Sequence, residues 1–313
     1  MDLHSGIQSA LNPQGPHADA VATLSWVLFY GGAGIFLLVI GLTTYVLWAP
    51  TERRVWAANK RFVIAGGLVF PIVTLTALLV YTFNVARAVV TNAGPADMRI
   101  EVVGEQWWWR VHYLDSKGET DFATANELRV PVGRTIDLEL KSADVIHSFW
   151  VPNLAGKLDM IPGRVTRLRI TADREGVFRG QCAEYCGGPH AQMAFYVIAQ
   201  SAESFETWRE GQRRPAVEAR GETLRHGQSL FLASCAVCHT VRGTPANGRL
   251  GPDLTHVGNR TSIAAGTLPN NPGTLAGWVS ASQHIKPGNL MPSMNIYTGA
   301  ELTAIAAYLA ALE

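Results

Sequence analysis

The chain has 313 residues, which exceeds one typical domain, so two or more domains are expected. Charged side chains make up only 16% of the residues and hydrophobic ones 48%, a balance that favours attachment to a membrane. The formal net charge of +1 argues against a general role in binding nucleic acid. The four cysteines form two close pairs, and since both pairs have a metal or cofactor explanation, no disulfide framework is left over.

The N-terminal part of the chain predicts a tail followed by a membrane anchor. Residues 1–23 contain no Lys or Arg, and we expect an extended tail. Because a signal peptide begins with positive residues, either one has been removed or the first hydrophobic helix directs insertion. Residues 24–48 and 62–86 are uncharged runs of 25 residues each, and about 20 apolar helical residues span a bilayer. We therefore predict a two-helix transmembrane hairpin over residues 24–86, in which Pro71 is tolerated.

The charges beside these runs predict the orientation of the hairpin. The intervening loop carries Arg53, Arg54, Lys60 and Arg61 against only Glu52. Positively charged loops remain in the cytoplasm, so both termini are expected on the other side. We predict a multi-pass protein of the bacterial inner (cytoplasmic) membrane, with its N-terminus and C-terminal domains periplasmic or extracellular.

From Met98 onward, short stretches rich in β-branched and aromatic residues alternate with turns that contain Gly and Pro. The predicted strands are residues 102–103, 111–113, 128–130, 135–140, 145–151, 165–170, 177–179 and 194–199. Many short strands at this spacing are typical of an all-β sandwich or barrel. We assign residues 87–205 to this domain.

Three consecutive tryptophans, Trp107, Trp108 and Trp109, lie near the start of this domain. Successive side chains of a strand point to opposite faces, so at least one of the three is expected to be exposed. Plain packing or a membrane-interface belt would account for the cluster without any further function.

The loop at residues 181–193 concentrates metal-binding groups. They are Cys182, Glu184, Cys186, His190 and Met193. Thiolate, imidazole and thioether together favour copper, and two thiols are enough to bridge two copper ions. A second imidazole must come from elsewhere, and His147 is the best-placed candidate. The alternatives are a small disulfide and a structural zinc site, but zinc sites usually lack methionine.

Further along the chain, residues 201–220 lose strand character, which predicts a short helix end and a linker at residues 206–220. Cys235, Cys238 and His239 then match the Cys-x-x-Cys-His signal for a covalently bound c-type haem. The two thiols would form thioethers to the haem vinyl groups, and His239 would be the proximal iron ligand. A redox or zinc pair is the alternative, but His239 follows directly and an amphipathic segment precedes the motif.

The last part of the chain offers a sixth ligand for the haem iron. A Met/His ligand pair is typical of electron-transfer cytochromes and raises the reduction potential. The candidates are Met291 and Met294, whereas His256 and His284 are expected to be surface residues. A terminal helix at residues 300–312 has the apolar spacing for packing against the first helix of an all-α domain, which we place at residues 221–313.

The metal-binding loop, preceded by His147, resembles the dinuclear copper-A site of cytochrome c oxidase subunit II. The resemblance implies a cupredoxin fold for the β domain. It implies that Cys182 and Cys186 bridge the two coppers, and that His147 and His190 each bind one of them.

The same resemblance assigns the remaining ligands. Met193 is the weak ligand of one copper, and the backbone carbonyl of Glu184 serves the other. In the family, the Glu184 side chain also helps to hold a magnesium ion against subunit I. Trp107 matches the first Trp of an aromatic stretch through which electrons enter, although Glu105 stands where many members have His.

The C-terminal domain resembles a class I cytochrome c. In the fused-cytochrome branch of the subunit II family, the sixth ligand lies in a Lys-Pro-Gly-x-x-Met-Pro segment, which matches Met291 rather than Met294. The whole chain therefore resembles subunit II of a caa3-type haem–copper oxidase. A short flexible linker would hold the cytochrome near the copper at a roughly millimolar effective concentration.

The resemblance implies an electron relay as the function. A donor such as cytochrome c would reduce haem c, and copper A would pass the electron to haem a of subunit I. Oxygen reduction coupled to proton translocation would occur in subunit I, which holds haem a, haem a3 and copper B, with subunit III as a further partner. No catalytic residue is expected in this chain, and no carboxylate stands near Ile64, where many members carry a Glu at a proton pathway.

Two other functions share these features. A nitric oxide reductase with a copper-A subunit would have the same anchor and copper loop. A free membrane-tethered electron carrier would not need Glu184 or the segment at residues 157–164, which in the family dock onto subunit I.

Overall fold

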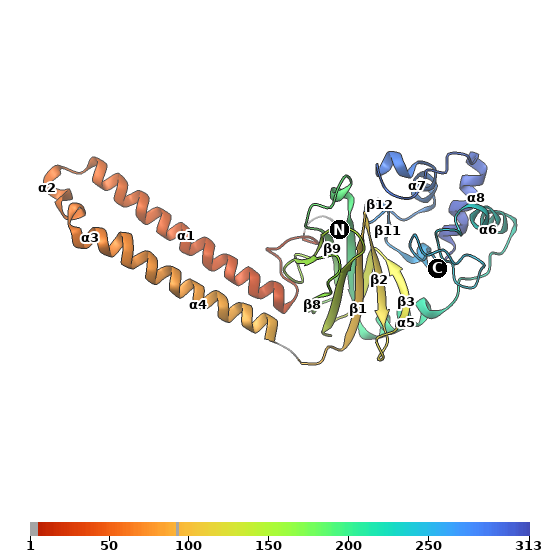
Figure 1. Ribbon diagram of the computed structural model, residues 1–313, viewed down its shortest axis with the longest axis horizontal. Coiled ribbons are helices and arrows are strands. Elements are labelled where there is room, and N and C mark those ends of the chain that lie inside the picture. Colours follow the sequence, from red (N-terminus) through yellow and green to blue (C-terminus); the bar gives the residue numbers. More distant parts are fainter. Residues whose placement is uncertain (1–5, 92–93) are drawn as a thin grey trace. The chain divides into compact units, whose positions relative to one another are not determined.

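The structure is a computed structural model that describes residues 6–91 and 94–313. The chain divides into two compact units, one formed by Asp19–Pro95 and the other by the residues up to Ala18 together with Ala96–Glu313. The second unit contains a β-sandwich and a helical domain, in agreement with the expected fold class. Figure 1 shows the elements in chain order.

The smaller unit is a pair of long helices, α1 (Pro16–Trp48) and α4 (Phe70–Thr91), which run in opposite directions (Figure 1). Short helical segments connect them: α2 (Thr51–Arg54), η1 (Val55–Ala58), α3 (Lys60–Ile64) and η2 (Ala65–Val69). The segments Pro16–Trp48 and Lys60–Arg87 are long and apolar enough to cross a membrane, which confirms the predicted hairpin. The first helix begins before the predicted residue 24, with Asp19 in its first turn, where an acidic side chain stabilises the helix dipole.

A π-helical turn, η2, lies just before Pro71 and explains how the second helix accommodates this residue. Proline has no N–H to donate and its ring clashes with the carbonyl four residues earlier. In η2 the ladder shifts by one residue, so that the Phe70 N–H bonds the carbonyl of Ala65. The widened turn keeps the helix continuous through the proline.

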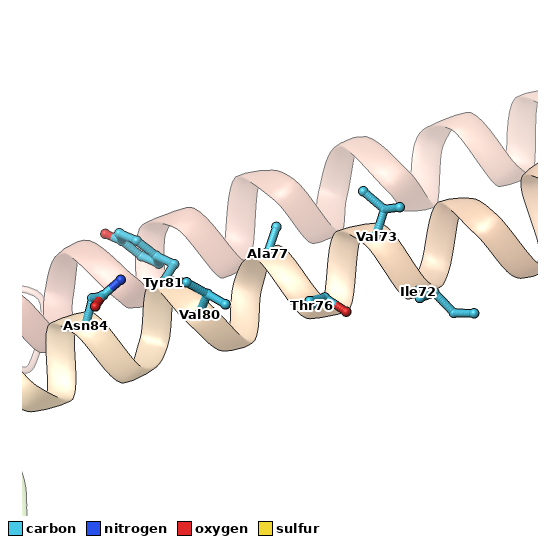
Figure 2. Close-up of a pocket in the computed structure, with 7 residues that line it drawn as sticks. All are labelled: Ile72, Val73, Thr76, Ala77, Val80, Tyr81 and Asn84. Carbon is cyan, nitrogen blue, oxygen red and sulfur yellow. The ribbon is translucent and has the colours of Figure 1, made fainter.

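One face of α4 forms a groove of about 730 Å³. Figure 2 shows the seven lining side chains along the helix: Ile72, Val73, Thr76, Ala77, Val80, Tyr81 and Asn84. Most of this surface is apolar, but Thr76, Tyr81 and Asn84 bring polar groups to it.

Residues 6–15 do not form the expected extended tail, because they pack against the β domain. The buried side chain of Asn153 donates through Nδ2 to the carbonyls of Gly6 and Asn12, both at 2.8 Å. The Arg179 N–H donates to the carbonyl of Ile7 at 2.7 Å. These bonds satisfy backbone groups of the segment, which would otherwise favour an exposed and irregular course.

The β domain is a sandwich of two five-stranded sheets. One sheet has the order β3 (Thr120–Ala125), β2 (Trp108–Leu114), β1 (Met98–Glu105), β5 (Ile136–Ser142) and β8 (Thr166–Ile170). The other has the order β4 (Glu127–Pro131), β10 (Ala194–Gln200), β9 (Gly176–Cys182), β6 (His147–Trp150) and β7 (Leu158–Met160). Both sheets are mixed, since β1 pairs with β5 and β10 pairs with β4 in parallel.

Alternation of buried and exposed residues builds the core between these sheets. In β1, for example, Ile100, Val102 and Gly104 are buried and their neighbours are partly exposed. The largest fully buried side chains include Trp109, Tyr113, Phe149 and Phe195, and the ring centroids of Trp109 and Phe195 are 4.9 Å apart. This cluster anchors the strand ends that carry the predicted metal-binding loop.

All eight predicted strand segments correspond to strands of the sandwich, and two strands were missed. The first, β3, contains Asp121 and two alanines, and it lies at a sheet edge where burial is incomplete. The second, β7, is only three residues long and is also an edge strand. Neither carries the continuous β-branched pattern that identifies a strand from sequence.

The C-terminal domain is helical, with α6 (Glu222–Ser234), α7 (Pro272–Ile285) and α8 (Gly299–Ala310), the short η4 (Val257–Asn259), and a small sheet of β11 (Ser262–Ile263) and β12 (Leu268–Pro269). The predicted packing of the first and last helices is confirmed, whereas α7 was not anticipated. A Cβ on Gly227 would lie 2.0 Å from the carbonyl oxygen of Ala304, so α6 and α8 touch through backbone.

Helix α5 (Ala202–Arg213) joins the two domains and is capped by Ser201, whose side chain accepts from the Ser204 N–H. Phe205 and Trp208 pack into the sandwich core, so the predicted linker at residues 206–220 begins within a helix. The expectation that His256 is a surface residue was wrong: it is 6% exposed, and its ring nitrogens lie 2.9 and 3.0 Å from the carbonyls of Glu313 and Arg214.

Candidate metal and haem sites

The predicted metal ligands meet at one end of the sandwich because of how its strands pair. Cys182 is the last residue of β9, and β10 begins directly after Met193. His147 opens β6, which lies beside β9 with Phe149 paired to Cys182. The loop between β9 and β10 contains η3 (His190–Gln192) and folds back over these strand ends.

The sulfur and nitrogen atoms of this loop converge on a small volume. The Cys182 and Cys186 sulfurs are 3.7 Å apart, and the Cys182 sulfur lies 3.8 Å from Nδ1 of His147. The Cys186 sulfur lies 3.4 Å from Nδ1 of His190 and 3.8 Å from the Met193 sulfur. The carbonyl oxygen of Glu184 is 3.1 Å from the Cys182 sulfur. All six predicted ligand residues are therefore brought together.

The two cysteines are free thiols rather than a disulfide. Their 3.7 Å separation is far beyond the about 2.05 Å of a sulfur–sulfur bond. Both are buried, and the ligand atoms of His147, Cys182 and Cys186 all lie within 4.8 Å of one another. These side chains form a cradle that could hold a metal ion, and the two sulfurs are not joined as the alternative of a small disulfide would require.

The electrostatics of the pair suit a bound cation. Hydrogen bonding from Cys186 lowers the pKa of the Cys182 thiol, with a further contribution from His147. The same bond to Cys182, together with burial, raises the pKa of Cys186. The lowered pKa favours the thiolate form of Cys182, which is the metal-binding form of cysteine.

Asp144 orients His147 within this cradle. Its Oδ1 lies 2.8 Å from Nε2 of His147, which leaves Nδ1 facing the cysteines. Burial alone would lower the pKa of His147, but hydrogen bonds with Cys182 and Asp144 outweigh it and raise the pKa above its ordinary value. The other oxygen of Asp144 accepts from the Gln106 N–H at 2.7 Å. A carboxylate behind a ligating imidazole is a common arrangement in metal sites.

The side chain of Glu184 points away from the thiols. It lies 3.4 Å from Nζ of Lys157, and the two side chains are 43% and 50% exposed. Only the carbonyl of Glu184 belongs to the cradle, and its carboxylate is available at the surface.

The three tryptophans have different environments. Trp109 is fully buried, while Trp107 and Trp108 are half-buried, so the expectation that at least one of the three is exposed was wrong. The guanidinium of Arg110 covers the ring of Trp108 at 4.6 Å. The Trp107 indole donates through Nε1 to the carbonyl of Cys186 at 2.9 Å. Trp107 therefore touches the backbone of a predicted copper ligand.

The predicted haem-attachment residues follow α6 directly. Cys235 and Cys238 are free and partly buried, and the Cys238 and His239 N–H groups both bond the Cys235 carbonyl. Nδ1 of His239 is 2.9 Å from the carbonyl of Pro252, which leaves Nε2 for a metal. Burial lowers the pKa of His239, so its imidazole is neutral and able to bind iron. A Cβ on Gly251 would lie 2.5 Å from Cε1 of His239, and the ring therefore rests on bare backbone.

Both candidate sixth ligands pack against the core of the helical domain. The carbonyl of Met291 accepts from Oγ of Ser282 and Nε2 of Gln283, both at 2.8 Å. The Met294 N–H donates to the carbonyl of Val279 at 2.9 Å. The backbone of each methionine is held by α7, so Met291 remains preferred over Met294 only by the sequence pattern. His284 is exposed, as expected.

Two residues near these sites were not found from sequence. Asp144 precedes His147 by three positions, a spacing that could have suggested a carboxylate partner. Lys286 is buried, and its nearest partners are backbone carbonyls far away in the sequence, so no local signal marks it.

Comparisons with known proteins match the β domain and the helical domain to two different families. Residues 116–200 match the family model described as cytochrome c oxidase subunit II, periplasmic domain, and residues 224–313 match the model described as cytochrome c. Cytochrome c oxidase subunit 2 of Alkalihalophilus pseudofirmus is 31% identical, over 97% of this chain and 91% of the relative. The Bacillus subtilis protein of that name is 30% identical, over 90% of this chain and 85% of its own length.

A solved structure covers the β domain alone. It is the periplasmic domain of subunit II of cytochrome oxidase from Bradyrhizobium japonicum, which is 32% identical with a TM-score of 0.36. The alignment covers 38% of this chain and 96% of that one.

Proposed function

This chain belongs to the cytochrome c oxidase subunit 2 family and ends in a cytochrome c domain, and from that premise we propose that it is the electron-entry subunit of a respiratory haem–copper oxidase. When bound, covalent haem c and a dinuclear copper-A centre would supply the one-electron chemistry that links a donor to haem a of subunit I. The observation that carries the proposal is the convergence of two unbonded thiols, two imidazoles and a thioether at one end of the sandwich, four of them from the loop at residues 181–193 and His147 from β6.

The donor set supports copper in particular. Two thiolates, each beside one imidazole Nδ1, provide two similar binding positions rather than one. The Met193 sulfur lies on the Cys186 side, and the Glu184 carbonyl lies on the Cys182 side. Cys182, Cys186, His147 and His190 would hold the metal, and soft sulfur with imidazole favours copper.

The protein's own contribution is to hold these groups still. Asp144 fixes the ring of His147, and backbone bonds between β9 and β10 fix Cys182 against Met193, whose carbonyl accepts from the Cys182 N–H at 2.9 Å. Ligands that cannot move cost little reorganisation when charge changes. In the haem domain, Cys235 and Cys238 would hold the macrocycle, and His239 and Met291 would bind the iron.

The partners follow from the family. Subunit I is the partner that membership in a haem–copper oxidase implies, and it would carry haem a, haem a3 and copper B, where oxygen is reduced and protons are translocated. The surface carboxylate of Glu184 would share a magnesium ion at that contact. Thr76 and Asn84 in the groove of α4 support a protein neighbour in the membrane, since intramembrane polar groups avoid lipid. Subunit III and a cytochrome c-like donor complete the proposed assembly.

The location follows from the anchor. The chain is anchored by two apolar helices, and we place it in the bacterial inner membrane. The cationic loop at residues 53–61 would face the cytoplasm, with both cofactor domains on the periplasmic side.

The test is the metal content and the EPR spectrum of the full chain, matured with haem and loaded with copper in detergent. We expect two coppers per haem and one unpaired electron shared equally over both nuclei. A single localised copper, or none, would overturn the assignment. Cys186→Ser should leave the haem spectrum unchanged while the shared-electron spectrum is lost, which separates the two sites.

A further inference from the structure

Lys286 directly follows α7 and is 2% exposed. It is the most deeply buried lysine among the described residues. Its Nζ lies 2.6 Å from the carbonyl oxygen of Trp107, 2.9 Å from that of Gln192 and 3.3 Å from that of Ala264. Three acceptors match the three N–H donors of an ammonium group. Two of these carbonyls belong to the β domain and one to the helical domain, so the side chain joins the two.

Burying a lysine in this way is costly and calls for a reason. Lysine is almost never fully buried unless it is paired, and burial lowers the pKa of Lys286 to about 7. Its acceptors are backbone carbonyls rather than a carboxylate, so they hold the group by position and not by charge neutralisation. An ordinary packing role would be met by leucine or methionine without this penalty.

The residues held by Lys286 stand next to both cofactor loops. Trp107 donates its indole N–H to the carbonyl of Cys186, and Gln192 immediately precedes Met193. On the other side, Lys286 opens the segment that leads to Met291. A Cβ on Gly288, within that segment, would lie 3.7 Å from the ring of Trp107. The indole therefore lies between the loop at residues 181–193 and the segment at residues 286–291.

Two further hydrogen bonds join the two domains at the same contact, and the backbone there has an unusual conformation. Nε2 of Gln192 donates to the carbonyl of Ile285 at 3.0 Å, and the Ala194 N–H donates to the carbonyl of Ala265 at 3.0 Å. Ala264 and Ala265 have φ of +54° and +59°, a left-handed conformation that is unfavourable for residues other than glycine. This conformation directs the Ala265 carbonyl toward β10 and the Ala264 carbonyl toward Lys286.

These contacts differ from those of transient electron-transfer partners. Encounter complexes use exposed charges that steer association and weaken with salt. Here the acceptors are backbone carbonyls, and the Lys286 side chain at the centre is shielded from solvent, so salt has little access to these bonds. The contact has the character of a fixed joint rather than of a tethered partner that docks and leaves.

We propose that Lys286 is a positioning residue that fixes the haem-bearing domain against Trp107, so that electrons leave haem c from a docked position. The proposal rests on the function proposed above. The transfer moves one electron from ferrous haem iron, which becomes ferric, to the copper centre, which is reduced by one electron, and no bond is made or broken. A docked haem domain takes the place of the repeated local encounters with the copper that a flexible linker would allow.

The experiment uses the full chain in detergent with both cofactors loaded, and compares Lys286→Met with the matched control Lys117→Met, which alters an exposed turn lysine. After flash reduction of haem c, we expect the haem-to-copper rate to fall about tenfold in Lys286→Met, because the observed rate scales with the docked fraction. The rate should also become sensitive to solvent viscosity. Hydrogen exchange at the Ala194 amide, which is protected by Ala265, should accelerate in the same variant.

Two further measurements keep the outcomes distinct. Gln192→Ala removes a second bond of the same contact without leaving an unpaired buried charge, and it should give a smaller change in the same direction. Unchanged rate and unchanged Ala194 exchange in both variants would overturn the positioning role. If the unaltered chain shows no shared-electron copper signal, or no haem-to-copper transfer, the proposed function itself fails instead. The haem and copper spectra of each variant identify any loss of a cofactor.

Discussion

The carboxylate of Asp144 joins two parts of the candidate copper site, since it contacts both His147 and the Gln106 N–H. Asp144→Asn keeps the shape of the side chain but removes the charge that makes the imidazole more basic. We expect copper affinity to fall about 10- to 100-fold, measured by competition with a chelator on the full chain. Asp173→Asn, at an exposed position, should leave the affinity unchanged. Equal affinities for the two variants would mean that Asp144 has no orienting role.

The sixth haem ligand can be decided by paired substitutions of Met291 and Met294. A thioether opposite histidine raises the haem potential, and leucine fills a similar volume without a ligand atom. Met291→Leu is expected to lower the haem c potential by on the order of 100 mV, a part of the roughly 0.8 V that axial ligands span. Met294→Leu should leave it near the original value in the same redox titration. The opposite result would transfer the assignment to Met294.

At the scale of helices, the haem domain depends on the close crossing of α6 and α8. A Cβ on Gly227 would meet the Ala304 carbonyl at 2.0 Å, and backbone on the facing helix cannot yield as a flexible side chain could. Gly227→Ala is therefore expected to destabilise the domain by about 1–3 kcal/mol through overpacking, seen as a lower Tm in the haem absorbance.

The matched control for this substitution is Gly277→Ala in α7, where an added Cβ meets nothing within 4 Å. There the change should stabilise the helix by ~0.5–1 kcal/mol, because alanine has less freedom to lose on folding. Stabilisation of both variants would show that helix propensity and not the crossing decides the effect of Gly227→Ala.

How far sequence reasoning reached depends on whether a feature is local. Five of the six predicted metal ligands lie in the short loop from Cys182 to Met193, so their types and spacing were enough to identify it. The haem motif is equally compact. The anchor helices were predictable because a membrane demands long apolar runs.

Features that depend on distant partners could not be read in the same way. Lys286 bonds Trp107 across 179 positions, and an isolated lysine in a sequence predicts a solvated side chain. His256 was expected at the surface and is buried, with its ring nitrogens beside the remote carbonyls of Glu313 and Arg214. The docked segment at residues 6–15 is held in the same manner, by Asn153 and Arg179 of the sandwich.

At the scale of the whole molecule, the two units have different roles: one is the membrane anchor and the other holds the predicted cofactor sites. The helices of Asp19–Pro95 expose apolar side chains along their length, as a membrane anchor must, and bury almost none of them. The remaining unit carries every predicted cofactor ligand. The sequence places the cationic loop between the helices, so the orientation of the anchor decides which side of the membrane holds the cofactors.

That orientation can be tested with the trypsin sites already present in the chain. Exposed Arg53, Lys60 and Arg61 lie in the loop between the helices, and exposed Arg213 and Arg220 lie between the cofactor domains. Because cationic loops are retained in the cytoplasm, trypsin added to spheroplasts should cut at Arg213 or Arg220 and release a haem-staining fragment, while the loop at residues 53–61 stays uncut.

Inverted vesicles supply the complementary result for the same membrane. There, trypsin should cut the loop at residues 53–61 and leave the haem fragment joined to the sandwich. Release of the haem fragment from inverted vesicles, with the intact chain protected in spheroplasts, would place the cofactor domains in the cytoplasm. A periplasmic electron donor could not reach haem c in that orientation, so this outcome would also contradict the proposed relay.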